Sequence, residues 1–150
     1  MIDQEEFIRT RMIDEVQSLV DSGFNRIAIG IMAQYIETLG AFLDKKPFKT
    51  PRQSSQRFHI ALEKLFPLRY SGFNKNNFLY KQLRSNFTHL GIESQFLVFD
   101  FTNNDTNSHL HFKDGKTTIV VSELLADYTK ACNTVIDLLQ NTSIKKKKLA

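Results

Sequence analysis

The stretch that decides the fold is RIAIGIMAQYIETLGAFLD, which covers residues 26–44. Its apolar side chains point to nearly every side of a helix, which is typical of a helix buried among other elements. Gln34 and Glu37 interrupt the apolar run, and the run is shorter than the roughly 20 residues of a membrane span. We therefore predict a central core helix over residues 26–44 and no membrane span.

Gly30 and Gly40 lie inside this helix, where each glycine costs about 1 kcal/mol relative to alanine. A close crossing with a second helix would offset that cost, because glycine has no side chain to hold two backbones apart. We expect another helix to pack tightly on the core helix.

Two long amphipathic helices are predicted near the ends of the chain. Over residues 3–21 apolar side chains recur every three or four positions, and Gly23 follows as a C-terminal cap. Ser122 is the predicted cap of a last helix over residues 123–141. The buried side of that helix would hold Leu124, Leu125, Tyr128, Cys132, Val135, Ile136 and Leu139.

A short third helix follows the core helix. Residues 45–53 contain two prolines and several cations, which is typical of a loop. Ser54 or Ser55 can cap the helix that begins there, and Pro67 ends it.

Strand signals are confined to one part of the chain. Residues 96–101 form an apolar run, and residues 110–112 are joined to residues 117–121 by the turn dipeptide Asp114-Gly115. We predict a small antiparallel sheet of two or three strands between the last two helices. The fold class is then mainly α, a bundle of about five helices with a small antiparallel β-hairpin.

Length and composition favour one ordered domain. The chain has 150 residues, of which 41% are apolar, and this is enough material for a single core. We assign residues 1–144 to this domain and expect the basic tail 145–150 to be frayed, because nothing in it neutralises Lys145–Lys148. Cys132 is the only cysteine, and the acidic start does not resemble a secretory signal, so we expect a reducing, cytoplasmic location.

Charge is divided unevenly along the chain. Residues 45–90 carry ten basic residues and one acidic residue, a net charge of +9. The thirds on either side are acidic, with −5 over residues 1–44 and −4 over residues 91–144. A basic middle third can attract an anionic partner such as a nucleic acid. The alternative is that these cations pair with acidic residues of neighbouring helices.

The fourth predicted helix carries a polar motif in its last two turns. It begins at residue 76 or 77, after a loop around residues 71–74, and runs to residue 90 with Gly91 as its terminating residue. Within it, Arg84, Ser85, Asn86 and His89 fall inside six positions. At 100° per residue, Ser85 and Asn86 lie near the face of His89, and the long arginine stem can reach it.

These residue types suit phosphodiester chemistry without a metal. The imidazole of His89 titrates near neutrality and can transfer a proton at a ribose hydroxyl, while the guanidinium of Arg84 can stabilise the charge on a phosphate. Asn86 or Ser85 could orient either group. In the alternative interpretation, His89 and Asn86 cap the last carbonyls of the helix and Arg84 forms an ion pair with Glu37 or another carboxylate at the edge of the core.

The string from Tyr80 to His89, Tyr80-Lys81-Gln82-Leu83-Arg84-Ser85-Asn86-Phe87-Thr88-His89, resembles the signature of the HEPN superfamily. In that signature an arginine, usually followed by a polar residue, precedes a histidine with four to six intervening positions. Residues 35–40 and the hairpin followed by a helix look like one group of small bacterial HEPN-like proteins of uncharacterised function. The similarity covers roughly residues 27–139.

The resemblance implies a helical bundle that forms a homodimer, with two copies of the motif in one cleft. Active members are metal-independent ribonucleases, often toxins or defence proteins, so it also implies RNA and, for a toxin, an antitoxin as partners. Arg84, Asn86 and His89 would be catalytic, with Tyr80, Lys81 and Ser85 as binding residues. The chain departs from the pattern at Ser85, where the family has Asn, Asp or His.

Two functional hypotheses follow from the motif. In the first, the chain is a HEPN-like homodimer that binds or cleaves RNA through Arg84, Asn86 and His89. In the second, it is a non-enzymatic assembly or regulatory module that uses the same polar residues at its dimer interface.

Other residues with chemical potential favour structural interpretations. His109 and His111 alternate on a predicted strand, but two histidines without a third ligand favour surface residues over a metal site. Cys132 lies on the buried stripe of the last helix and is expected to be a packed thiol. Tyr70, Phe73 and Phe78 are the best candidates for base stacking, although core packing is favoured for all aromatic residues. The sequence has no glycine-rich phosphate loop, and we expect no cofactor and no metal.

Overall fold

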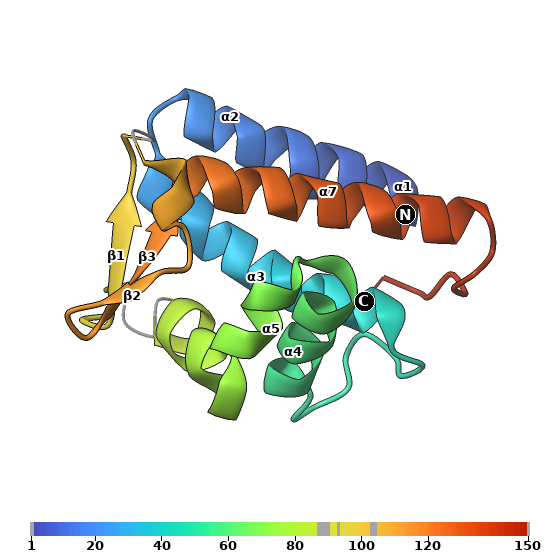
Figure 1. Cartoon of the computed structure of the whole chain (residues 1–150). Coiled ribbons are helices and arrows are strands. Elements are labelled where there is room, and N and C mark those ends of the chain that lie inside the picture. The colour runs from blue at the N-terminus through green and yellow to red at the C-terminus, as the bar shows by residue number, and fades with distance from the viewer. Residues whose placement is uncertain (1, 87–90, 93, 103–104, 150) are drawn as a thin grey trace.

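Helix α3 (Asn25–Leu43) runs through the middle of the molecule in the computed structural model (Figure 1). The structure describes residues 2–86, 91–92, 94–102 and 105–149. One layer, formed by the N-terminal helix and α7 (Val121–Gln140), covers one side of α3, and α4 (Ser54–Leu65) covers the other. The predicted central helix is therefore confirmed, and the fold is mainly helical.

The N-terminal helix is continuous but not uniform. It consists of α1 (Gln4–Phe7), the π-helical segment η1 (Ile8–Asp14) and α2 (Glu15–Asp21). Asp3 caps it by accepting a hydrogen bond from the N–H of Glu5 at 3.1 Å. Gly23 follows with a φ of 84°, which is the left-handed conformation predicted for the terminating residue. Periodicity indicated the helix but not its π-helical turn.

Helix α4 crosses α3 at Gly40. A Cβ atom at this position would lie 1.9 Å from the carbonyl oxygen of Arg57, so the predicted close crossing is confirmed and only glycine fits there. The predicted serine cap of α4 is wrong. Gln53 occupies the N-cap, and its side chain makes no capping hydrogen bond.

A short helix, α5 (Leu68–Phe73), replaces the loop predicted around residues 71–74. Pro67 occupies its N-cap with a φ of −51°, so the proline that ends α4 also directs the chain into the next helix. The backbone then passes through the 3₁₀ turn η2 (Lys75–Asn77), in which Asn76 and Asn77 have φ angles of 57° and 59°. Asparagine tolerates this left-handed conformation better than most residues.

The fourth helix begins after this turn, near the predicted position. Residues 78–86 are helical, and the segment η3 (Tyr80–Ser85) is π-helical. The predicted end at residue 90 lies outside the described residues.

The sheet has three strands, β1 (Leu97–Asp100), β2 (Phe112–Lys113) and β3 (Lys116–Val120), in the order β1-β3-β2. The predicted hairpin at Asp114-Gly115 is confirmed, and both residues have the positive φ that a tight hairpin turn requires. The all-antiparallel prediction is wrong, because β1 pairs with β3 in parallel. In the sheet, β3 lies between β1 and β2, although both of those strands precede it in the sequence.

Strand β3 leads directly into α7, so Val120 is both the last strand residue and the N-cap of the helix. Ser122, the predicted cap, therefore lies inside the first turn. The predicted buried stripe is confirmed for all its members except Leu125, which is partly buried. Tyr128 donates a hydrogen bond from its hydroxyl to the carbonyl oxygen of Met12 at 2.7 Å, which joins α7 to the N-terminal helix.

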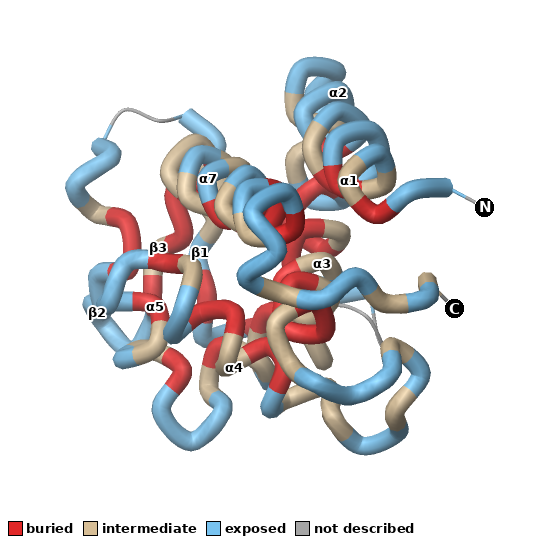
Figure 2. The backbone as a smooth tube through the Cα atoms, turned by 90° about the vertical axis from the view of Figure 1, so that its right-hand side faces the viewer, coloured by how far each residue is buried: buried red, intermediate tan, exposed pale blue. Residues whose placement is uncertain are grey.

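Buried residues, red in Figure 2, gather where α3, α4 and α7 meet. In the part of the chain that the structure describes, no helix combines the length and the apolarity needed to cross a membrane.

The C-terminal tail folds back from α7 toward the end of α3 (Figure 1). Lys147 pairs with Asp44 at 2.8 Å, and Lys146 pairs with Asp3 at 3.5 Å. The prediction that nothing neutralises this tail is therefore wrong, because its partners lie about 100 or more residues earlier in the chain.

Candidate functional site

Arg84 projects from η3 and is held by Glu37 of α3. Its Nε donates to Oε2 of Glu37 at 2.9 Å, and its Nη2 forms an ion pair with the same oxygen at 2.8 Å. The two side chains are only 17% and 21% exposed. The alternative interpretation, in which Arg84 forms an ion pair with Glu37, is therefore confirmed. A phosphate could reach this guanidinium only in competition with the carboxylate.

The helical turn that carries Arg84 is π-helical. The N–H of Asn86 donates to the carbonyl oxygen of Lys81, five residues earlier. This bonding changes the rotation per residue over η3. The directions predicted relative to His89 involve a residue that lies outside the described part of the chain. Single π-helical turns inside α-helices are frequent at functional sites.

The other predicted site residues differ in their exposure. Lys81 is exposed, whereas Ser85 and Asn86 are half-buried. Tyr80 packs its ring edge-on against Phe58, with ring centroids 5.6 Å apart, so its aromatic face belongs to the core. His89, with the catalytic and capping roles predicted for it, lies outside the described residues.

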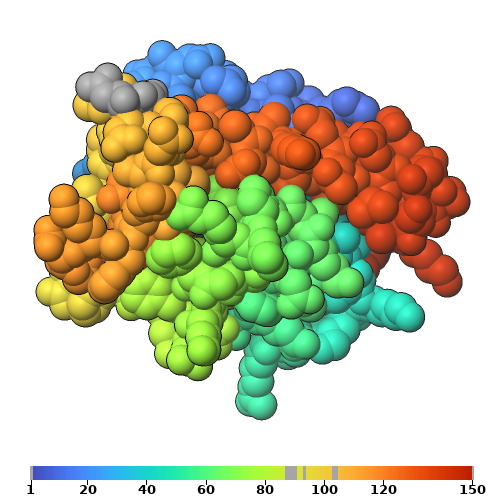
Figure 3. Space-filling view, in the orientation of Figure 1, coloured from blue at the N-terminus to red at the C-terminus, as the bar shows by residue number. Residues whose placement is uncertain are grey.

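Ten of the 20 lysines and arginines lie in one segment of the chain. Residues 45–86, here called the basic layer, form the loop after α3 together with α4, α5, η2 and η3, and carry ten cations and one carboxylate. Helices α4 and α5, green in Figure 3, lie below the orange-red α7. The uneven charge along the sequence thus becomes an uneven charge in space.

Ion pairs neutralise few of these cations. Arg57 pairs with Asp44 at 2.6 Å and Arg84 pairs with Glu37. Eight others form no ion pair with any carboxylate that the structure describes: Lys45, Lys46, Lys49, Arg52, Lys64, Arg69, Lys75 and Lys81. The predicted pairing with neighbouring helices is therefore confirmed for only two of the ten.

A buried hydrogen-bonded chain joins α5, the loop before β2, and α7. The N–H of Val120 donates to Nδ1 of His109 at 3.0 Å, so the hydrogen of the neutral ring is on Nε2. That Nε2–H donates to the hydroxyl of Tyr70 at 2.7 Å. The hydroxyl of Tyr70 in turn donates to Oδ2 of Asp127 at 2.6 Å.

Burial keeps Tyr70 and His109, the tyrosine and histidine of this hydrogen-bonded network, in their neutral forms. Burial lowers the pKa of His109 to about 4. Burial also raises the pKa of Tyr70, and the hydrogen bond to the carboxylate of Asp127 raises it further. The prediction that His109 is a surface residue is wrong, since it is 8% exposed, whereas His111 is exposed. Both ring nitrogens of His109 are engaged, so this imidazole offers no lone pair to a metal. Tyr70 is 3% exposed, which removes it as a base-stacking residue.

Two other predicted residues are part of the core. Cys132 is fully buried, and burial raises the pKa of its thiol to about 12, which confirms a packed thiol. Phe73 and Phe78, the other stacking candidates, are partly buried and pack against the core.

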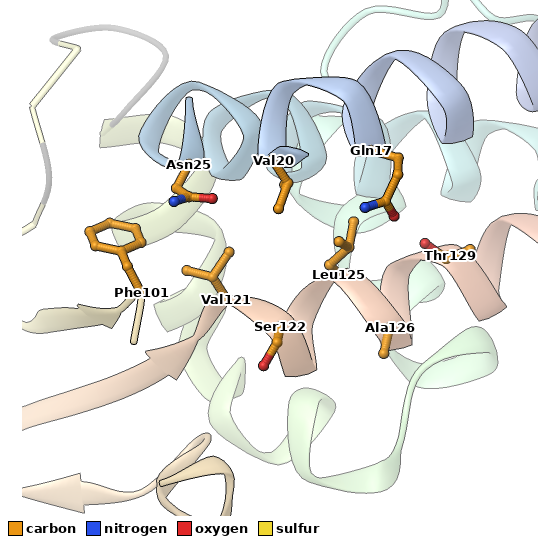
Figure 4. Close-up of a pocket in the computed structure, with 9 residues that line it drawn as sticks. All are labelled: Gln17, Val20, Asn25, Phe101, Val121, Ser122, Leu125, Ala126 and Thr129. Carbon is orange, nitrogen blue, oxygen red and sulfur yellow. The ribbon is translucent and has the colours of Figure 1, made fainter. Parts of the chain in front are cut away.

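A cavity of about 390 Å³ lies between α2 and α7 (Figure 4). Its lining includes Val20, Val121 and Leu125, with Phe101 at one end. None of its nine lining residues titrates near neutral pH, so the cavity has no group for acid or base catalysis.

No family model, curated protein or solved structure matches the chain.

Proposed function

We propose that this protein binds the phosphate backbone of RNA through the basic layer, as a HEPN-like homodimer. The supporting observation is the set of eight cations that no described carboxylate neutralises. Cations on one surface displace the counterions of a nucleic acid and gain free energy from their release. The net negative charge of residues 1–44 would orient the basic layer toward the RNA.

Binding is better supported than cleavage. The guanidinium of Arg84 forms a hydrogen-bonded ion pair with Glu37, and this pair fastens η3 to α3 within the same chain. A catalytic arginine must instead direct its donors at the charge that develops on the phosphate. We therefore propose that Arg84 holds the motif in place, and that Lys64, Lys75 and Lys81 contact RNA.

The same ion pair favours a second candidate function, a non-enzymatic assembly module. In that function the motif would shape a surface for a partner chain, and RNA binding would be absent. Light scattering tests the homodimer that both candidates require, and a strict monomer would contradict it.

Binding is tested by the fluorescence anisotropy of a labelled single-stranded RNA, titrated with protein at several salt concentrations. Replacing Lys64, Lys75 and Lys81 together by alanine should lower the slope of log K against log salt by about 2, given roughly 0.7 per phosphate contact for single strands. Lys130→Ala, on the acidic helix α7, is the matched control and should leave the slope unchanged. Absence of binding by the wild-type protein at low salt would refute RNA binding.

Cleavage is tested in EDTA with the wild-type protein and the Arg84→Ala and His89→Ala variants. We expect intact RNA in every reaction. Cleavage by the wild type that both variants lose would overturn the assignment of Arg84 to a positioning role.

A further inference from the structure

The C-terminal tail and the loop after α3 enclose a second basic feature. A cavity of about 540 Å³ lies between residues 42–45 and residues 143–147, and its lining includes Lys45, Lys145 and Lys146. Figure 3 shows the red tail beside the cyan stretch after α3. Two segments about 100 residues apart in the sequence thus bring their lysines to one cavity.

The ammonium group of Lys147 fixes the tail in this position. It donates to the carbonyl oxygens of Ala41 and Lys46, and to Oδ1 of Asp44 at 2.8 Å. It also lies 5.5 Å from the centre of the Phe48 ring, within the range of a cation–π interaction. The side chain of Lys147 is only 14% exposed, so its charge is used inside the protein.

Asp44 connects this anchor to the core. Its carboxylate accepts from Nε of Arg57 at 2.6 Å as well as from Lys147. Burial raises its pKa, but the hydrogen bonds from Arg57 and Lys147 outweigh burial and hold the pKa below its ordinary value. One carboxylate thus faces two cations, and it has no negative charge left for the other lysines.

The remaining lysines of the cavity are available to an anion. Lys45 and Lys145 form no ion pair with a carboxylate in the described part of the chain. Lys146 has only a long contact of 3.5 Å with Asp3, and both of those side chains are more than half exposed. Such exposed pairs are weak and exchange readily.

We propose that this cavity binds a phosphate group of the RNA backbone, with Lys45 and Lys145 as its direct contacts. This inference rests on the proposed function and extends the binding surface from the basic layer to the tail. Lys147 does not touch the phosphate. It is a positioning residue, because its anchored ammonium holds Lys145 opposite Lys45.

The first test compares RNA affinity among three variants by fluorescence anisotropy. The Lys45→Ala, Lys145→Ala double variant should bind RNA several-fold more weakly, with a salt slope lower by about 0.7, because one phosphate contact is lost. Lys147→Met should weaken binding as well, and trypsin should cut its tail faster, because the anchor is lost. Lys130→Ala should match the wild type in both measurements. Unchanged RNA affinity and salt slope in the double variant would overturn the cavity assignment while leaving RNA binding by the basic layer intact.

The second test uses inorganic phosphate alone, followed by amide chemical shifts in NMR spectra of the full chain. Phosphate should shift the amides of Ser143 and Lys145 in the wild type, and not in the double variant. If these shifts occur but no RNA binds, the proposed function fails while the anion site stands. If phosphate causes no shift at these amides, the anion site is refuted.

Discussion

Protonation of His109 should destabilise the fold as the pH falls below about 6.5. In the folded protein Nδ1 accepts the N–H of Val120, and this lone pair must be given up when the ring takes a second proton. Burial lowers the pKa of His109 from 6.5 to about 4. The unfolded chain therefore binds more protons than the folded chain between these two values, and stability rises with pH across that window.

The size of the effect follows from the shift in pKa. A difference of about 2.5 units at about 1.4 kcal/mol per unit corresponds to roughly 3 kcal/mol, fully present above pH 7 and lost by pH 4. This is a large share of the total stability of a domain of this size.

Urea unfolding followed by circular dichroism at several pH values between 4 and 7.5 measures this dependence. His109→Gln removes the titrating ring, so its unfolding free energy should depend less on pH than that of the wild type, by about 3 kcal/mol over the window. His111→Gln, two residues away and exposed, is the matched control and should behave like the wild type. Equal pH dependence in His109→Gln and the wild type would refute the role of burial at His109.

Further predictions concern packing and charge. Gly40→Ala should destabilise the protein by more than about 2 kcal/mol in urea unfolding, since the new Cβ would overlap a backbone oxygen of α4. Gly72→Ala, which meets no atom within 4 Å, should instead be neutral or stabilise α5 by up to about 1 kcal/mol. A double-mutant cycle of Arg84→Ala and Glu37→Ala should give a coupling energy of about 1–3 kcal/mol, and a value near zero would contradict the ion pair. Cys132 should react with a thiol reagent only when urea unfolds the chain, and rapid reaction of the native protein would contradict its burial.

Sequence periodicity predicted the elements that are long or locally encoded. Helix α3 was predictable because an apolar run of that length must be buried in the core of the protein. Gly40 indicated that a second helix, α4, crosses α3 closely. The β2–β3 hairpin was predictable because its turn dipeptide fixes the backbone without help from distant residues.

Elements that depend on distant partners were not predictable. The parallel pairing of β1 depends on where β3 inserts, which no local pattern encodes. Helix α5 has only six residues, too few for a periodicity to emerge. The π-helical turns leave no known pattern in the residue types of η1 and η3.

The same division applies to the candidate site. The pairing of Arg84 with Glu37 was foreseen as one alternative, because both residues flank the apolar side of their helices. The chain from His109 through Tyr70 to Asp127 was not foreseen, since its members come from three separate elements. The anchoring of Lys147 was missed because two of its acceptors are backbone carbonyls. Every residue has a backbone carbonyl, so the residue type does not indicate which one accepts a hydrogen bond.

The direct passage from β3 into α7 limits how the chain can change in length. Val120 is shared by the strand and the helix, so an inserted residue has no loop in which to be absorbed. One extra residue there would turn the whole of α7 by about 100° and carry Tyr128 away from Met12. Insertions are thus excluded at this junction, because the end of β3 fixes the rotation of the 20-residue helix α7.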